Sequence, residues 1–170
     1  MSEATEPIGL SWTLRTSFLQ YIASMPDGRG VLARGAVETA GHGITFPPAS
    51  AHFDRTSGDG TIRFGGEVTF SGHFGMLNMR IADPWIDTAD GSGTLFVAAR
   101  SGDEEGSAPF ATFAFDYATT DATYLWRARD VRLLAHGSAL FGDVYPEGEQ
   151  LDPFVAALDR ALLDDDPAQA

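Results

Sequence analysis

The sequence predicts a single-domain, mainly β protein of the α+β class: an antiparallel β-sandwich or curled sheet of about eight to ten short strands, with a helix at each end. Three observations predict this fold. The chain has 170 residues, 44% of them hydrophobic, which suffices for one core of its own. Between Val31 and Ala135, apolar residues recur with the period of two that is typical of half-buried strands. Asp-Gly pairs at 27–28, 59–60 and 90–91 indicate tight turns in that region.

The first predicted element is an amphipathic helix from Ser11 to Ala23. Its apolar residues Leu14, Phe18 and Ile22 recur every four positions, which is helical spacing and places them on one core-facing stripe. Ser11 suits the N-cap position, and Pro26 ends the segment.

The strands are predicted from short runs of alternating apolar and polar side chains. Turn residues separate the runs, which is the pattern of an antiparallel sheet. One charged segment between two runs, 102–106, is expected to be an exposed acidic loop. The clearest runs are Ile62, Phe64, Val68 and Phe70, followed by Leu77, Met79 and Ile81.

A second helix, about three turns long, is predicted from Asp152 onward. Asp152 suits its N-cap, and Pro153 suits its first helical position. Apolar residues at helical spacing would then form one face. The residues of that face are Phe154, Leu158, Ala161 and Leu162.

The composition excludes several classes of site. The chain has no cysteine, so disulfides, thiolate metal sites and cysteine nucleophiles are absent. It also has no lysine, which excludes a Walker-type phosphate loop and a Schiff-base nucleophile. Its net charge of −13, from 24 acidic residues against 11 arginines, argues against nucleic acid as a partner.

The two ends of the chain are expected to be flexible, over residues 1–9 and in the acidic tail 164–170. Residues 1–6 carry acids where a signal peptide would carry basic and apolar residues. No apolar run approaches the length of about 20 residues that a membrane-spanning helix needs. A cytoplasmic protein is therefore expected.

Six ordered blocks of sequence carry a more specific indication. They span nearly the whole chain, and the block from Val68 to Leu77 is the most specific. Together they resemble the HtaA family of haem-binding domains. The blocks are Leu10-Ser11-Trp12, Ser17-Phe18-x-x-Tyr21-Ile22, Ile44-Thr45-Phe46-Pro47, Val68-Thr69-Phe70-Ser71-Gly72-His73-x-Gly75-x-Leu77, Asp83-Pro84, and Tyr145-Pro146-x-Gly148-x-x-Leu151-Asp152-Pro153.

The resemblance implies a site for haem b, Fe(III) protoporphyrin IX. Tyr21 would be the axial iron ligand, His73 the hydrogen-bonding partner of its phenolate oxygen, and Ser17 and Tyr145 contacts of the propionates. Tyrosine is a known haem ligand, and a phenol, with an unperturbed pKa of about 10, needs help from the iron and from a neighbour to ionise. The chain departs from the family at Val144, where phenylalanine is common.

The implied role is that of a haem carrier or store, which exchanges haem with other haem-transfer proteins as a monomer or homodimer. Family members are typically exported, and their segment after Leu-Asp-Pro is usually extended, so the cytoplasmic location and the C-terminal helix expected here would both be departures. Spacing adds support, because Ser17 and Tyr21 share one helical stripe. Which of Tyr21 and Tyr145 binds iron stays open. The arginines that could pair with propionates are Arg15, Arg80 and Arg132.

Each of these residues also has an ordinary structural role to be weighed. Tyr21 could be a half-buried packing residue, His73 a turn histidine, and Ser17 a serine that bonds to its own helix. Tyr145 could anchor a loop. Two other functions are therefore carried forward: an enzyme that uses Tyr21 and His73 as an acid/base pair, and a β interaction module that binds no haem.

Overall fold

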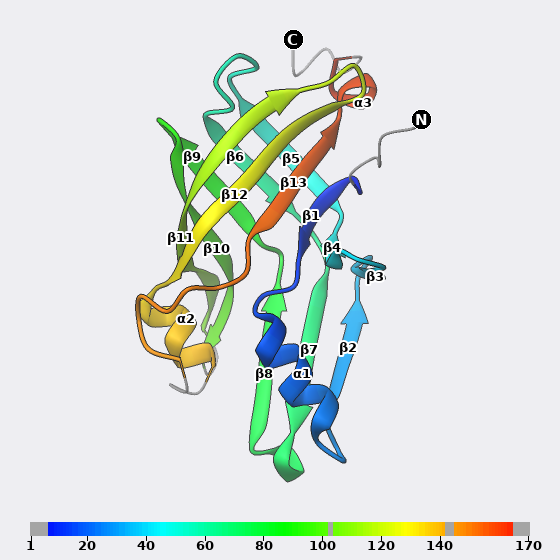
Figure 1. The fold of residues 1–170 in the computed structure, drawn as a ribbon, viewed down its shortest axis with the longest axis vertical. Coiled ribbons are helices and arrows are strands. Elements are labelled where there is room, and N and C mark those ends of the chain that lie inside the picture. Colours follow the sequence, from blue (N-terminus) through cyan, green and yellow to red (C-terminus); the bar gives the residue numbers. More distant parts are fainter. Residues whose placement is uncertain (1–6, 102–103, 142–144, 165–170) are drawn as a thin grey trace.

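The structure is a computed structural model that describes residues 7–101, 104–141 and 145–164. It is mainly β, as the sequence predicted, with two antiparallel sheets (Figure 1). The large sheet has ten strands in the spatial order β3 (Val37–Thr39), β4 (Gly43–Phe46), β1 (Gly9–Trp12), β13 (Phe154–Asp159), β12 (Thr123–Leu133), β11 (Glu104–Thr119), β10 (Ser92–Ser101), β9 (Trp85–Ala89), β6 (Gly60–Phe64) and β5 (Pro48–Phe53). The small sheet has the order β2 (Arg29–Ala33), β7 (Glu67–Gly72) and β8 (Leu77–Ala82).

Three short helices complete the described part of the chain: α1 (Thr16–Ser24), α2 (Ala135–Leu140) and α3 (Arg160–Asp164). Figure 1 shows the small sheet extending below the large one, with α1 lying against it. A 3₁₀ turn, His73–Gly75, joins β7 to β8 at the far end of the small sheet. In the described residues, no helix is both long enough and apolar enough to cross a membrane.

The core lies between the strands and beneath α1. Trp12 is fully buried and meets Phe110 and Phe154 edge-on, with ring centroids 5.7 and 6.0 Å apart. The predicted stripe of Leu14, Phe18 and Ile22 is buried. Phe18 and Ile22 confirm that this face of the first helix points inward, whereas Leu14 precedes the helix and has a positive φ of 56°. These aromatic contacts join the two ends of the chain, because Trp12 and Phe154 lie on neighbouring strands.

The beginning of the first helix differs from the prediction. Ser11 is not an N-cap but a buried residue of β1, and its hydroxyl is hydrogen-bonded to that of Thr45 over 2.9 Å. The helix begins only at Thr16. The residues before it form a strand because β4 and β13 both offer them main-chain partners.

The predicted C-terminal helix is wrong over most of its length. Phe154–Asp159 is strand β13, which lies between β1 and β12, and only Arg160–Asp164 is helical. The reason for the error is geometric: residues four apart, such as Phe154 and Leu158, lie on one face of a strand as well as of a helix. Main-chain pairing with β1 on one side and β12 on the other favours the strand over the helix. The extended segment after Leu-Asp-Pro is therefore no departure from the family pattern.

Strand number and turns also differ in detail from the prediction. The described residues form thirteen strands rather than eight to ten, and β13 and the second half of β1 fall in segments predicted as helical. Asp90-Gly91 is a tight turn with positive φ at both residues, as predicted. Asp59-Gly60 is not, because the turn lies at 55–57 and Gly60 begins β6.

Two further predictions concern segments that lie partly outside the described residues. Of the expected acidic loop 102–106, residues 102–103 lie outside the described part, and 104–106 belong to β11. Most of the expected flexible ends, 1–9 and 164–170, also lies outside it, although Gly9 begins β1 and Asp164 ends α3.

The burial of β13 on both faces yields a test of its assignment. Ala156 and Ala157 are both fully buried, on opposite faces of the sheet. We expect Ala156→Leu and Ala157→Leu each to lower the free energy of unfolding by about 1–3 kcal/mol through overpacking. Urea unfolding would measure the change. Val155→Leu, at a half-buried position, is the control, and equal effects of all three changes would contradict this assignment.

Candidate functional site

The candidate site is a largely apolar pocket of about 640 Å³ between α1, the β7–β8 turn and the end of α2. Helix α1 supplies one wall, the turn and the start of β8 supply a second, and the chain around Tyr145 supplies a third. The pocket brings together segments that are more than 100 residues apart in the sequence. The lining residues are Phe18, Tyr21, His73, Phe74, Met76, Leu77, Phe141 and Tyr145.

A direct contact between Tyr21 and His73 is the polar centre of this pocket. The Tyr21 hydroxyl is hydrogen-bonded to Nε2 of His73, although 52 residues separate them. A neutral phenol donates to an unprotonated Nε2, and a protonated Nε2 donates to a phenolate, so the pair suits both states of the tyrosine. Tyr21 is 46% exposed, which leaves it accessible to a ligand.

A row of aromatic rings forms the floor of the pocket. Phe18 meets Phe70 edge-on at 5.3 Å and Phe141 edge-on at 5.0 Å. Phe141 in turn meets Tyr145 edge-on at 5.1 Å. These rings tie α1 to the small sheet and to the region around α2, so the floor is built from packed core residues rather than from loose surface side chains.

The turn that carries His73 has an unusual backbone. His73, Phe74 and Gly75 all have positive φ, at 49°, 57° and 89°. Residues with a β-carbon are disfavoured in this left-handed region. The turn directs Phe74 into solvent, where it is 99% exposed. Asp27 supports the turn, because its Oδ2 accepts a hydrogen bond of 2.7 Å from the main-chain N–H of Phe74.

Close packing fixes the C-terminal end of α1 near the same turn. A β-carbon on Gly28 would lie 1.9 Å from the main-chain oxygen of Ile22, and one on Gly72 would lie 2.7 Å from Cε of Met25. Glycine at position 28 allows the end of the helix to approach β2, because the main chain of Ile22 leaves no room for a β-carbon, whereas the Met25 methyl beside Gly72 is the end of a flexible side chain. Tyr21, one turn before the end of the helix, thereby comes within reach of His73.

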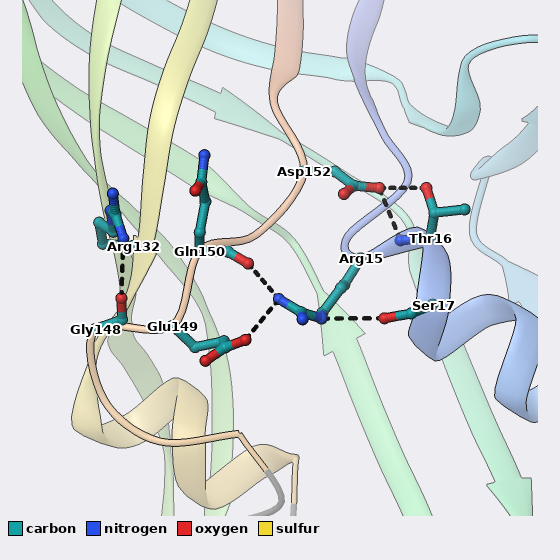
Figure 2. Close-up of polar contacts among 8 residues, drawn as sticks. All are labelled: Arg15, Thr16, Ser17, Arg132, Gly148, Glu149, Gln150 and Asp152. Atoms are coloured by element: carbon teal, nitrogen blue, oxygen red, sulfur yellow. Dashed lines mark hydrogen bonds and ion pairs between the residues drawn. The ribbon is translucent and has the colours of Figure 1, made fainter.

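The N-terminal end of α1 is capped by a residue from far along the chain. Arg15 occupies the N-cap but makes no capping hydrogen bond with its side chain. Instead, Oδ2 of Asp152 accepts hydrogen bonds from the main-chain N–H of Thr16 at 2.7 Å and from the hydroxyl of Thr16 (Figure 2). The hydroxyl of Thr13 donates a third hydrogen bond to the same oxygen. The main-chain oxygen of Asp152 accepts a further one from Nε1 of Trp12. A carboxylate also suits the positive end of the helix dipole.

Comparison with known proteins identifies the family. The HtaA family model matches residues 8–157. The chain belongs to the HtaA family. The HtaA C-terminal domain from Corynebacterium glutamicum has a similar crystal structure, with 28% identity and a TM-score of 0.75 over 88% of this chain and 94% of that one. The HtaA N-terminal domain from the same organism is 26% identical, with a TM-score of 0.70 over the same shares.

A more distant structural neighbour is the haem-binding protein HtaB from Corynebacterium glutamicum. It is 20% identical, with a TM-score of 0.61 over 87% of this chain and 91% of that one. At this identity the likeness shows the fold alone. No curated protein matches the chain at a significant level.

In this HtaA domain, three of the four residues singled out from the sequence line the pocket: Tyr21, His73 and Tyr145. Ser17 does not line it and lies in an adjoining polar groove. Val144 lies outside the described residues. In the described part of the chain, no group of three or more His, Asp or Glu side chains is placed to hold a metal ion.

Sequence reasoning missed the two aspartates that position the HtaA site. Asp152 was predicted to cap a helix, which is its role, but the helix is α1 rather than one that follows it. Asp27 was predicted only as a turn residue. Nothing in the local sequence indicates that its carboxylate supports the turn of His73, because the partner lies 47 residues away.

Removal of the Asp152 cap should destabilise the domain. We expect Asp152→Ala to lower the free energy of unfolding by about 1–2 kcal/mol, the usual range for loss of an N-cap. Asp152→Asn should retain part of that stability, since an amide oxygen also accepts hydrogen bonds at this position. Urea unfolding gives the measurement, with Glu147→Ala as the control acid from the same segment. Equal stabilities of all variants would show that the cap contributes nothing.

The support from Asp27 should depend on pH. The hydrogen bond from the Phe74 main chain holds the pKa of the Asp27 carboxyl below its ordinary value of 3.8. A carboxyl with a lowered folded-state pKa stabilises the fold above the unfolded value, and this stability disappears as pH falls through the folded value. Asp27→Asn should therefore melt below wild type at neutral pH. The difference should shrink as pH falls through the lowered folded-state pKa, because the aspartate then also becomes neutral. Melting curves from neutral to acidic pH provide the test, and a constant difference would contradict it.

Proposed function

We propose that the pocket binds ferric haem, Fe(III) protoporphyrin IX, with the phenolate oxygen of Tyr21 as the axial iron ligand. The observation that carries the proposal is the hydrogen-bonded pair of Tyr21 and His73 in an otherwise apolar pocket. Membership of the HtaA family supports it.

The residues present fit such a ligand. Haem is a large apolar disc with two carboxylates at one edge, and a pocket of about 640 Å³ lies within the range of about 300–1,000 Å³ typical of cofactor sites. Phe18, Leu77 and Phe141 supply apolar walls. When bound, the haem iron supplies a Lewis acid that favours the ionised form of a tyrosine ligand.

His73 would assist by holding the ligand oxygen. Once Tyr21 has lost its proton, Nε2–H of His73 donates a hydrogen bond to the phenolate and keeps its oxygen directed into the pocket. A hydrogen bond to a charged acceptor is stronger than one between neutral groups. Tyr145 has a different environment, because its ring packs on Phe141 and beneath Arg15. The proposal therefore assigns Tyr21, rather than Tyr145, to the iron.

The exposed apolar side chains at the pocket mouth fit the proposal as well. Phe74 is 99% and Met76 90% exposed, and both line the pocket. Large apolar side chains this exposed cost free energy unless a ligand or partner covers them. A flat apolar ligand against the turn would bury both.

We propose the role of a haem carrier or store rather than an enzyme. The pocket opens to solvent and Tyr21 is partly exposed, which would allow haem to pass to another haem-transfer protein. An anionic oxygen ligand favours Fe(III) over Fe(II), so reduction would weaken the hold on haem. The oligomeric state, monomer or homodimer, remains a prediction.

An absorption titration of the apo-protein with ferric haem tests this proposal. Wild type should show a saturable one-to-one shift to a high-spin, tyrosinate-type spectrum. Tyr21→Phe should abolish that spectrum. His73→Ala should weaken binding about tenfold to a hundredfold, because a hydrogen bond to a charged group contributes about 1.5–3 kcal/mol.

Two tyrosine variants serve as controls for the titration. Tyr117→Phe lies outside the pocket and should bind as wild type does, and Tyr145→Phe should keep the tyrosinate spectrum. A tyrosinate spectrum that survives Tyr21→Phe but not Tyr145→Phe would refute the assigned ligand. Wild-type spectra like those of haem with an inert protein would refute haem binding. Degradation of bound haem in the presence of reductant would favour the enzyme that uses Tyr21 and His73 as an acid/base pair.

A further inference from the structure

A polar groove of about 520 Å³ adjoins the apolar pocket, and an arginine lies at the boundary between them. Helix α1 joins the two spaces, because Ser17 lines the groove and Phe18 lines the pocket. Tyr145 joins them a second time, since it lines the pocket while the guanidinium of Arg15 lies 4.8 Å from the centre of its ring. The groove is lined by Arg15, Ser17, Glu149, Gln150, Leu151, Asp152 and Pro153.

The guanidinium of Arg15 is held in place by several contacts. Its Nε–H donates to the hydroxyl oxygen of Ser17 at 3.1 Å, and Nη1 donates to the main-chain oxygen of Gln150 (Figure 2). Nη1 also lies 2.9 Å from Oε1 of Glu149. A guanidinium has five N–H donors in a fixed plane, and these contacts involve Nε and Nη1. The cation is therefore oriented before any ligand arrives.

The ion pair with Glu149 shows that the guanidinium of Arg15 accepts a carboxylate as its partner. The two side chains are 27% and 30% exposed, so water screens their attraction and the pair is weakly held. A second carboxylate could thus replace that of Glu149 without leaving a buried charge behind. The hydroxyl of Ser17 accepts from Arg15, which leaves its own proton to be donated to the same carboxylate.

The two other arginines considered from the sequence have different settings. Arg80 is bonded to Glu67. Arg132 is bonded to Asp130 and, more weakly, to the main-chain oxygen of Gly148 at 3.5 Å (Figure 2). Neither Glu67 nor Asp130 lines the apolar pocket. Arg15 is set apart from them by its contact with Tyr145, a wall of the pocket.

Beside Ser17, which the family resemblance already implies as a contact of the propionates, we propose that Arg15 recognises the carboxylate edge of the pocket's ligand, and that Glu149 occupies this position until the ligand displaces it. The inference rests on the proposed haem site, because haem presents apolar surface and carboxylates together. In a protein with a net charge of −13, a dianionic edge needs a local cation. Glu149 sets the affinity by competing for that cation.

The test compares ferric protoporphyrin IX with its dimethyl ester, which keeps the apolar disc and loses both charges. Each is titrated into the whole chain and followed by absorption. Wild type should bind the acid more tightly than the ester. Arg15→Gln should lower affinity for the acid about tenfold and leave affinity for the ester unchanged. Glu149→Gln should raise affinity for the acid about threefold, because the competing carboxylate is gone.

Arg80→Gln is the matched control, since it removes one arginine whose partner, Glu67, lines neither the groove nor the pocket, and it should change neither affinity. If Arg15→Gln lowered the affinity for the acid and the affinity for the ester equally, the inference would be overturned, and Arg15 would be a residue that packs on Tyr145. Unchanged or lower affinity for the acid in Glu149→Gln would overturn the competition. Should Arg15→Gln fail to fold by circular dichroism, the wild-type preference for the acid and the Glu149→Gln result decide the matter. Wild type that binds neither ligand would refute the haem site itself, whereas wild type that binds both equally would refute only the role of Arg15.

Discussion

The position of helix α1 is the constraint on which the pocket depends. A helix of nine residues is too short to be stable in isolation, so contacts from elsewhere must hold it. Asp152 caps its first turn, and the buried side chains of Phe18 and Ile22 hold its middle. Gly28 allows its last turn to pack closely against the start of β2. Tyr21 lies between these contacts, which place its hydroxyl within hydrogen-bonding distance of His73.

The β7–β8 turn shows how the fold places strain beside a site. Left-handed backbone at two consecutive residues with β-carbons is costly, at about 1–2 kcal/mol each. The hydrogen bond from the Phe74 main chain to Asp27 offsets part of that cost. The result is a turn that holds His73 against Tyr21 while it leaves Phe74 in solvent. Such strain tends to cluster where a ligand is bound.

The large sheet couples the two ends of the chain to the same site. Strand β13 pairs with β1, so the segment that leads into β13 passes beside the start of α1. That segment carries Glu149 and Asp152, one bonded to Arg15 and the other to the helix N-terminus. Sheet pairing thus determines both the orientation of the helix and the charge in the polar groove that adjoins the pocket, although neither Glu149 nor Asp152 lines the pocket itself.

The sequence by itself determined the mainly β fold, the inward face of the first helix and the family, because alternation, helical spacing and ordered motifs are local properties. It also selected Tyr21, His73 and Tyr145, which line one pocket. It could not determine that 154–159 is a strand, because Phe154 and Leu158 share a face in either element and only pairing with β1 and β12 decides. Nor could it show that Asp152 caps α1 or that Asp27 holds the turn of His73. Those contacts join residues far apart in the chain, and only the tertiary structure brings such residues together.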